Sequence, residues 1–181
     1  DEALAFRQYV SAEARTTAIS INGVNWLING QIVNAGTAAA GQLINLRMVA
    51  AGIDDEQATT NVHWAYPSGP AEPWNPSRHV AEMLTQIPGY RTRGLNAMTI
   101  SLQGGSQRPF YSGNAAADPN WPIISAFTSD GSLKTAYLTR FNQIIEACDM
   151  NSLVVILTLF YFGQDNRLSN QSAIESGVDN V

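Results

Sequence analysis

The chain has 181 residues, of which 45% are hydrophobic and 14% charged, a composition that suits one globular domain and excludes a disordered chain. The formal net charge is -5 and lysine and arginine form no cluster, so we expect no nucleic-acid partner. No apolar run approaches the roughly 20 residues that a membrane-spanning helix needs, so we expect no membrane partner.

The single cysteine, Cys148, excludes an internal disulfide and lies in a helical pattern, where we expect a buried and inert thiol. It leaves the redox compartment open, although we favour an extracellular or periplasmic location. The chain starts at Asp1 rather than at a methionine, so we expect a processed or truncated N-terminus.

Residues 16–30 predict an initial β-hairpin. Ile19 and Ile21 alternate with small or polar residues, as in a strand with one apolar face. Asn22-Gly23 is the strongest short hairpin signal, because a type I′ turn needs a positive φ at both central residues. The alternation continues to a second turn at Asn29-Gly30.

The rest of the chain alternates strand and helix patterns. Residues 43–51 are the first candidate core strand, with helix as a rival, and residues 95–102 and 153–160 are the second and third. A helix begins at the cap Asn75 with Pro76 in its first turn, and Pro88 should end or kink it. Further helices are expected at 132–149 and 173–181. Asn151 should end the former, and the almost wholly apolar strand 153–160 should be buried on both faces.

Strand–helix alternation predicts a parallel α/β sheet, open or closed into a barrel. Helix-to-strand turns are short, whereas strand-to-helix connections are long, which places the functional face at the carboxyl ends of the strands. We predict a partial (β/α)8 TIM barrel: residues 1–181 form one domain, the first three β/α units preceded by the hairpin. Such a piece alone should aggregate or form a loose, dye-binding state.

Polar and aromatic residues at this edge are the candidate saccharide-binding residues. Gln103 follows the second strand, and Tyr161, Gln164 and Asp165 follow the third, so they should cluster. Trp64 and Tyr66, in the loop after the first strand, should close over the same mouth and stack on sugar rings. The alternatives are turn chemistry, helix capping and packing of the long loops.

Arg47 is a charge within an apolar strand. It must be paired or point into the barrel mouth, where it would join the saccharide-binding set. The acidic residues 54–56 follow the same strand, and a structural ion pair with one of them is the favoured interpretation.

Other chemistries lack support. Gly104-Gly105 opens into a long loop and not into a helix, which argues against a phosphate site. His63 and His79 have no second ligand at metal spacing, and no Gly-x-Ser-x-Gly elbow occurs. We therefore expect no metal and no cofactor. Asp165 is the best acid at the edge but has no evident carboxylate partner, so we assign no catalytic residue.

The chain resembles clan A glycoside hydrolases. Residues 21–31 (Ile-Asn-Gly-Val-Asn-Trp-Leu-Ile-Asn-Gly-Gln) are similar to the pattern x-Ile-Asn-Gly-Lys-Pro-x-x-Leu-x-Gly that often begins their barrels. Later segments resemble a set of bacterial cellulase-like TIM-barrel proteins, and they are spread along most of residues 18–181: 46–49, 94–105, 130–138 and 154–168.

The resemblance implies retaining hydrolysis of β-linked saccharides, with an oligo- or polysaccharide as partner. In that clan the acid/base belongs to an Asn-Glu pair ending the fourth strand, and the nucleophile ends the seventh. No Asn-Glu pair occurs here, so no catalytic role is carried over, and the 181 residues alone should lack hydrolytic activity. The alternatives are a non-catalytic carbohydrate-binding barrel and a complete small α/β protein of another role. The sugar, the linkage and the oligomeric state stay open.

Overall fold

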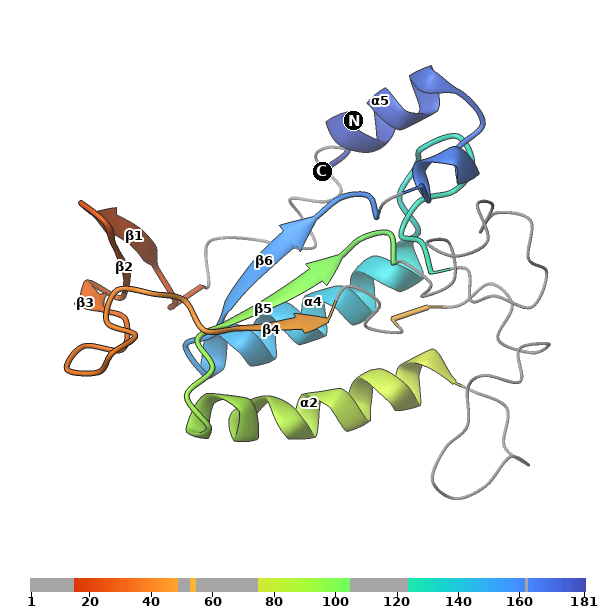
Figure 1. The fold of residues 1–181 in the computed structure, drawn as a ribbon. Coiled ribbons are helices and arrows are strands. Elements are labelled where there is room, and N and C mark those ends of the chain that lie inside the picture. The colour runs from red at the N-terminus through yellow and green to blue at the C-terminus, as the bar shows by residue number, and fades with distance from the viewer. Residues whose placement is uncertain (1–14, 49–52, 55–74, 105–123, 162) are drawn as a thin grey trace.

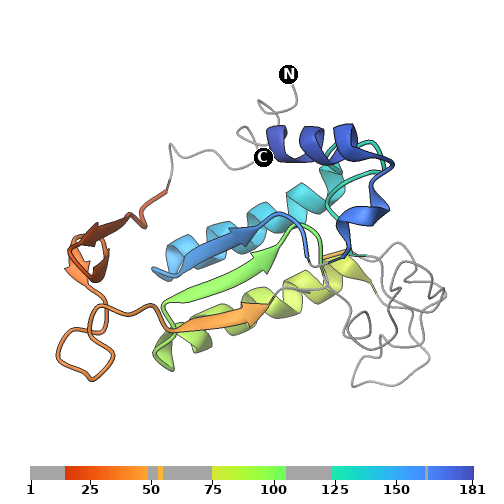
Figure 2. The same cartoon turned by 45° about the horizontal axis from the view of Figure 1, so that its top comes forward.

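The computed structural model describes residues 15–48, 53–54, 75–104, 124–161 and 163–181. Its main unit is a parallel sheet in the order β4-β5-β6, formed by β4 (Asn45–Met48), β5 (Ala97–Ser101) and β6 (Val154–Thr158). Helices α2 (Pro76–Thr92) and α4 (Thr135–Met150) connect successive strands and cover one face of the sheet (Figures 1 and 2). The predicted parallel pairing of the second and third strands is confirmed, with Ala97 opposite Val154.

This sheet is open, and the prediction of a partial TIM barrel is therefore wrong. Within the described residues β4 and β6 each pair with β5 alone, and no closed sheet forms. The described residues form a small α/β fold with two separate three-stranded sheets. An open parallel sheet and a barrel share the same strand–helix alternation. Closure depends on strand number, tilt and stagger, and hydrophobic periodicity reports none of these.

The second sheet is antiparallel and consists of β1 (Ile19–Asn22), β2 (Asn25–Ile28) and β3 (Gln31–Ile32). Asn22 pairs with Asn25, so the first turn is Gly23-Val24, with a positive φ at Gly23 only, as in a type II′ turn. The type I′ pattern predicted at Asn22-Gly23 occurs instead at Asn29-Gly30, where φ is 52° and 75°.

Helix α2 begins as predicted, because the side chain of Asn75 accepts a hydrogen bond from the amide of Arg78 at 2.9 Å and Pro76 follows it. Pro88 does not end the helix, which continues to Thr92. A proline removes one backbone hydrogen bond, and the buried side chains of Met83 and Ile87 still hold this turn against the core.

Burial is greatest in the central strand. All five residues of β5 are buried, whereas those of β6 are only half-buried. The prediction that residues 153–160 are buried on both faces is therefore wrong, because β6 lies at an edge of the described sheet and pairs, among the described residues, with β5 alone. The core lies between the sheet and the helices, and its buried members include Met98, Ile100, Leu102, Val80, Ile87, Tyr137, Phe141 and Ile144.

Helix α5 (Gln171–Asp179) lies beside the segment that precedes α4, beyond the carboxyl ends of the strands (Figure 1). The two meet closely: a Cβ built on Gly131 would lie 2.1 Å from the carbonyl oxygen of Ala173. Ser169 donates its amide to the carbonyl of Ser129 at 2.7 Å. The ring of Phe127 packs on that of Phe160 with centroids 5.2 Å apart.

Two polar joints tie the antiparallel sheet and its flanks to the rest. The buried Asn96, just before β5, accepts hydrogen bonds from the side chain of Asn34 at 2.8 Å and the amide of Ile44 at 3.2 Å. At the other joint, Asp149 near the end of α4 accepts from the amides of Thr16 and Thr17. Asn151 has φ −108°, so the left-handed residue after α4 is Ser152 and not Asn151 as predicted.

Candidate functional site

The carboxyl ends of β5 and β6 carry hydroxyl groups that bind one another. The side chains of Ser101 and Thr158 lie opposite each other in the register and share a hydrogen bond. The phenol of Tyr137, on α4, donates to the carbonyl of Ser101 at 3.0 Å. Polar groups from two strands and one helix therefore meet at this edge.

Gln103 follows β5 and is fully buried. Its backbone amide donates to the carbonyl of Leu159 at 3.0 Å, which holds it beside the end of β6, and it forms an isolated bridge with Ser125. Neither its side-chain oxygen nor its side-chain nitrogen has a hydrogen-bond partner in the described part of the chain. An unsatisfied buried amide costs about 1–3 kcal/mol, so this side chain is a candidate for binding a ligand.

Gln164 is the second buried glutamine, with 2% of its surface exposed. Its side-chain oxygen accepts a hydrogen bond from Nε of Arg167 at 2.7 Å, whereas its Nε2 has no partner among the described residues. A turn holds the residue in place, because its backbone amide donates to the carbonyl of Tyr161 at 2.9 Å. Gln164 therefore offers a free side-chain NH2 group as donor.

The other predicted site residues differ in position. Tyr161 is half-buried, and Asp165 is exposed at the start of the short 3-10 helix η3 (Asp165–Arg167). Hydrogen bonds bring Gln103 to the end of β6 and Gln164 to Tyr161. Trp64 and Tyr66 lie outside the described residues, so their closure over the site stays a prediction.

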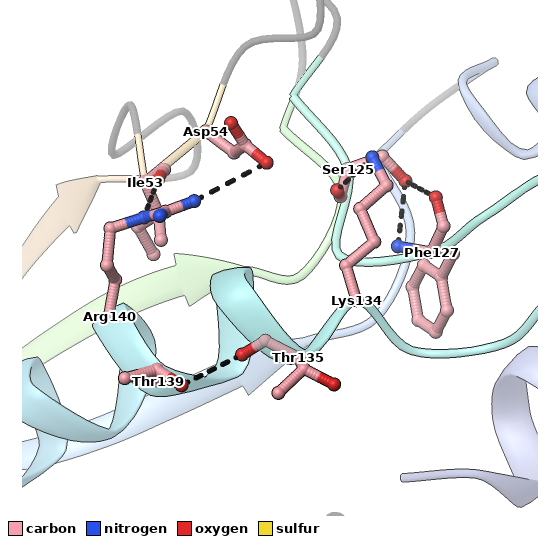
Figure 3. A network of polar contacts seen from close by, with 8 residues as sticks. All are labelled: Ile53, Asp54, Ser125, Phe127, Lys134, Thr135, Thr139 and Arg140. Carbon is pink, nitrogen blue, oxygen red and sulfur yellow. Dashed lines mark hydrogen bonds and ion pairs between the residues drawn. The ribbon is translucent and has the colours of Figure 1, made fainter. Parts of the chain in front are cut away.

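Arg47 does not pair with Asp54, one of the acids predicted for it; Asp55 and Glu56 lie outside the described residues, and a saccharide-binding role for Arg47 stays a prediction. Asp54 forms an ion pair with Arg140 on α4, with Nη2 3.4 Å from Oδ2, and Nε of Arg140 donates to the carbonyl of Ile53 at 2.7 Å (Figure 3). Arg47 is exposed and pairs with no acid in the described ranges. Its neighbours in β4, Leu46 and Met48, pack on the helix side, and because side chains alternate along a strand, Arg47 points to the opposite face.

Sequence reasoning missed a second set of polar contacts, at the N-terminus of α4. Lys134 donates its side-chain ammonium to the carbonyl of Ser125 at 2.9 Å (Figure 3). The hydroxyl of Ser125 in turn donates to the carbonyl of Phe127 and accepts from its amide. The signal available in the sequence was the single lysine, which directly precedes a helix. The pairing of Ser125 with Gln103 cannot be read from hydrophobic periodicity.

The electrostatics of the edge keep its phenol neutral. Burial, and secondarily the Asp54 carboxylate, raises the pKa of Tyr137 well above its ordinary value, while Arg140 opposes this rise. Tyr137 is therefore a hydrogen-bond donor at neutral pH. Within the described ranges, no group of three or more His, Cys, Asp or Glu side chains is placed to hold a metal ion.

No family model, no curated protein and no solved structure matches this chain. In the part of the chain that the structure covers, no helix combines the length and the apolar character needed to cross a membrane. A functional proposal therefore depends on the chemistry of the edge and on the resemblance in the sequence.

Proposed function

We propose that this chain binds a saccharide at the carboxyl ends of β5 and β6. We further propose that it is part of a glycoside hydrolase that cleaves β-linked saccharides with retention of configuration. The observation that carries the binding proposal is Gln103: a fully buried amide with both polar atoms unpartnered among the described residues. A protein interior rarely leaves such a group unmatched unless a ligand or water completes it.

The residue chemistry favours a sugar over other ligands. A primary amide offers a donor and an acceptor side by side, and a sugar hydroxyl can satisfy either one. A phosphate ester, with acceptor oxygens only, would leave Oε1 of Gln103 unpartnered, and an apolar ligand would leave both atoms so. Nε2 of Gln164 adds a donor, and the half-buried ring of Tyr161 adds a face suited to sugar C–H groups.

The hydrolytic part of the proposal depends on the resemblance. Retaining hydrolysis uses two carboxyl groups about 5–5.5 Å apart. At the described part of this edge, Asp54 is engaged by Arg140 and Asp165 is exposed, so we assign neither a catalytic role. Because amides and hydroxyls dominate the described edge, a non-catalytic saccharide-binding role is the second candidate.

Replacement of Gln103 tests the binding proposal. Gln103→Met keeps the volume and removes the unpartnered amide. We expect it to weaken binding of a β-1,4-linked oligosaccharide by about tenfold or more in titration calorimetry, because about 1–3 kcal/mol of hydrogen bonding is lost. The same variant should raise the free energy of unfolding by about 1 kcal/mol, since the ligand-free protein no longer buries an unmatched amide. Gln143→Met, at an exposed position of α4, is the control and should change neither quantity.

Loss of stability in Gln103→Met with unchanged saccharide affinity would assign Gln103 a structural role. Absence of binding to every α- and β-linked oligosaccharide tested would refute the proposal for the chain. Release of reducing sugar by the wild-type chain would overturn both the non-catalytic alternative and the expectation that these 181 residues alone lack hydrolytic activity.

A further inference from the structure

The parallel sheet has two faces of different chemistry. Toward α2 and α4 it presents apolar side chains that belong to the hydrophobic core or pack against it: Leu46, Met48, Met98, Ile100, Val155 and Leu157. Because side chains alternate along a strand, the residues between them point to the other face, here named the outer face. Both α2 and α4 lie on the opposite side of the sheet from this outer face (Figures 1 and 2).

The outer face is polar along β4 and β5. Arg47 of β4 lies beside Thr99 of β5 in the register. The hydroxyl of Thr99 donates to Oδ1 of Asn45 at 2.9 Å. Ser101 follows Thr99 on the same face and shares a hydrogen bond with the hydroxyl of Thr158. A row of amide and hydroxyl groups therefore leads from Arg47 to the carboxyl edge, where the proposed saccharide site lies.

Arg47 is the only charged residue in these three strands. Its side chain is exposed, and within the described ranges no acid forms an ion pair with it. A guanidinium presents a planar fork of donors that matches a carboxylate in a bidentate pair. The row thus ends in a group that selects an anion, whereas its other members suit neutral hydroxyls.

The separation of Arg47 from Gln103 determines the size of a ligand that reaches both. Thr99, the neighbour of Arg47, lies four positions before Gln103 in the chain. A strand rises about 3.3 Å per residue, so the two side chains start roughly 13 Å apart. This span exceeds one sugar ring, and the ligand must therefore be an oligosaccharide.

We propose that the saccharide bound at this edge is acidic, and that a uronic acid carboxylate of the oligosaccharide pairs with the guanidinium of Arg47. This substrate class rests on the saccharide-binding proposal above. Gln103 and Gln164 bind hydroxyl groups, and Arg47 distinguishes a carboxylate from the hydroxymethyl group of a neutral sugar. The net charge of -5 repels an anionic ligand from the rest of the surface, which leaves Arg47 as its point of attachment on this face.

Titration calorimetry with two matched ligands tests the proposal. A β-1,4-linked oligoglucuronate and the β-1,4-linked oligoglucose of the same length differ only in carboxylate against hydroxymethyl. Wild type should bind the oligoglucuronate at least about tenfold more tightly, and added salt should reduce this preference. Arg47→Gln should abolish the preference and change the affinity for oligoglucose by less than about twofold.

Arg91→Gln is the matched control. It removes the same charge from an exposed position in the last turn of α2, which lies on the other side of the sheet, and it should keep the preference for oligoglucuronate. Circular dichroism of each variant checks that the fold is retained. A sulfated oligoglucose of the same length offers an anion without a planar carboxylate. Tighter binding of this ligand than of oligoglucuronate would overturn the assignment of a carboxylate.

The outcomes separate this inference from the saccharide-binding proposal. Equal affinity of wild type for oligoglucuronate and oligoglucose overturns the acidic substrate class and leaves saccharide binding in place. Binding of neither ligand overturns both. An equal loss of the two affinities in Arg47→Gln would assign Arg47 a structural role and remove its carboxylate.

Discussion

Asp149 shows how one side chain can hold two distant segments together. Its carboxylate oxygens accept hydrogen bonds from the amide of Thr16 at 3.0 Å and from the amide of Thr17 at 2.7 Å. Burial acts to raise the pKa of Asp149, but the hydrogen bonds from Thr16 and Thr17 outweigh it and lower the pKa below its ordinary value of 3.8. The charged form is thus the one that the folded state prefers.

The sign of the pH dependence follows from this lowered pKa. The stabilisation by Asp149 is fully present above about pH 4, the range of an unperturbed aspartate, and disappears as the pH falls through the lower folded-state value. We expect Asp149→Asn to reduce the free energy of unfolding at neutral pH by about 1 kcal/mol. The loss is small because solvent screens the partly exposed carboxylate. Urea titrations at several pH values measure it.

The variant should also flatten the acid side of the stability profile. Asp179→Asn is the control, because Asp179 is exposed at the end of α5 and accepts no side-chain hydrogen bond in the described ranges. An equal effect of the two substitutions would mean that the contacts of Asp149 with Thr16 and Thr17 contribute nothing.

The sequence could predict where the site residues lie but not what surrounds them. Gln103 and Gln164 were selected because they follow strands, and hydrogen bonds do hold both at the ends of these strands. The surroundings of Gln103 include residues 124–125, which pair with the backbone of residues 103–104, and no local pattern encodes this long-range contact. Closeness in sequence does not pair Arg47 with Asp54, because Asp54 meets Arg140 across the fold.

At the scale of elements, the attachment of α5 depends on one glycine. Gly131 has φ +90°, and a Cβ there would lie 2.1 Å from a backbone oxygen of α5. Gly94 has the same φ, but a Cβ there would meet nothing within 4 Å. Substitutions at Gly94 and at Gly131 can therefore be compared to separate the cost of backbone strain from the cost of a steric clash.

We expect Gly94→Ala to lower the free energy of unfolding by about 1 kcal/mol, the usual cost of a left-handed non-glycine residue. Gly131→Ala should cost at least about 2 kcal/mol, because α5 must shift as well. Urea denaturation followed by circular dichroism compares the two. Equal losses would show that α5 is not held by this close approach.

Element boundaries were predictable where a single residue type determines them. Asn75 and Pro76 mark the start of α2, and Gly94 closes the segment, because their side chains or backbone preferences act locally. The first hairpin turn was misplaced by one residue, since the pairing of Asn22 with Asn25 depends on the whole register and not on the dipeptide.

At the scale of the whole molecule, stability should be unevenly distributed. In the described chain the hydrophobic core contains residues of the parallel sheet and its helices, but none of β1, β2 or β3. We expect amide hydrogen exchange to be slowest in β5 and fastest in the antiparallel sheet at low protein concentration. Exchange in β1–β3 as slow as that in β5, measured in dilute protein, would contradict this picture.

The class of the fold was predictable, but its closure was not. The alternation of strands and helices requires a parallel sheet, and β4, β5 and β6 are parallel neighbours. Whether such a sheet curls into a barrel depends on strands that lie far apart in the chain, and a resemblance to barrel proteins could not replace that information. The open sheet and the separate antiparallel sheet are properties of the tertiary structure.

The hydrogen bond between Asn34 and Asn96 has a consequence for the order in which the molecule folds. The strands of the antiparallel sheet are joined by two-residue turns, so this sheet can form in microseconds. The parallel sheet joins residues about 50 or more positions apart, which makes its assembly slower. Asn96 accepts Asn34 only when both sheets exist. We therefore expect the small sheet to form first and to take its direction relative to the core only after the parallel sheet has assembled.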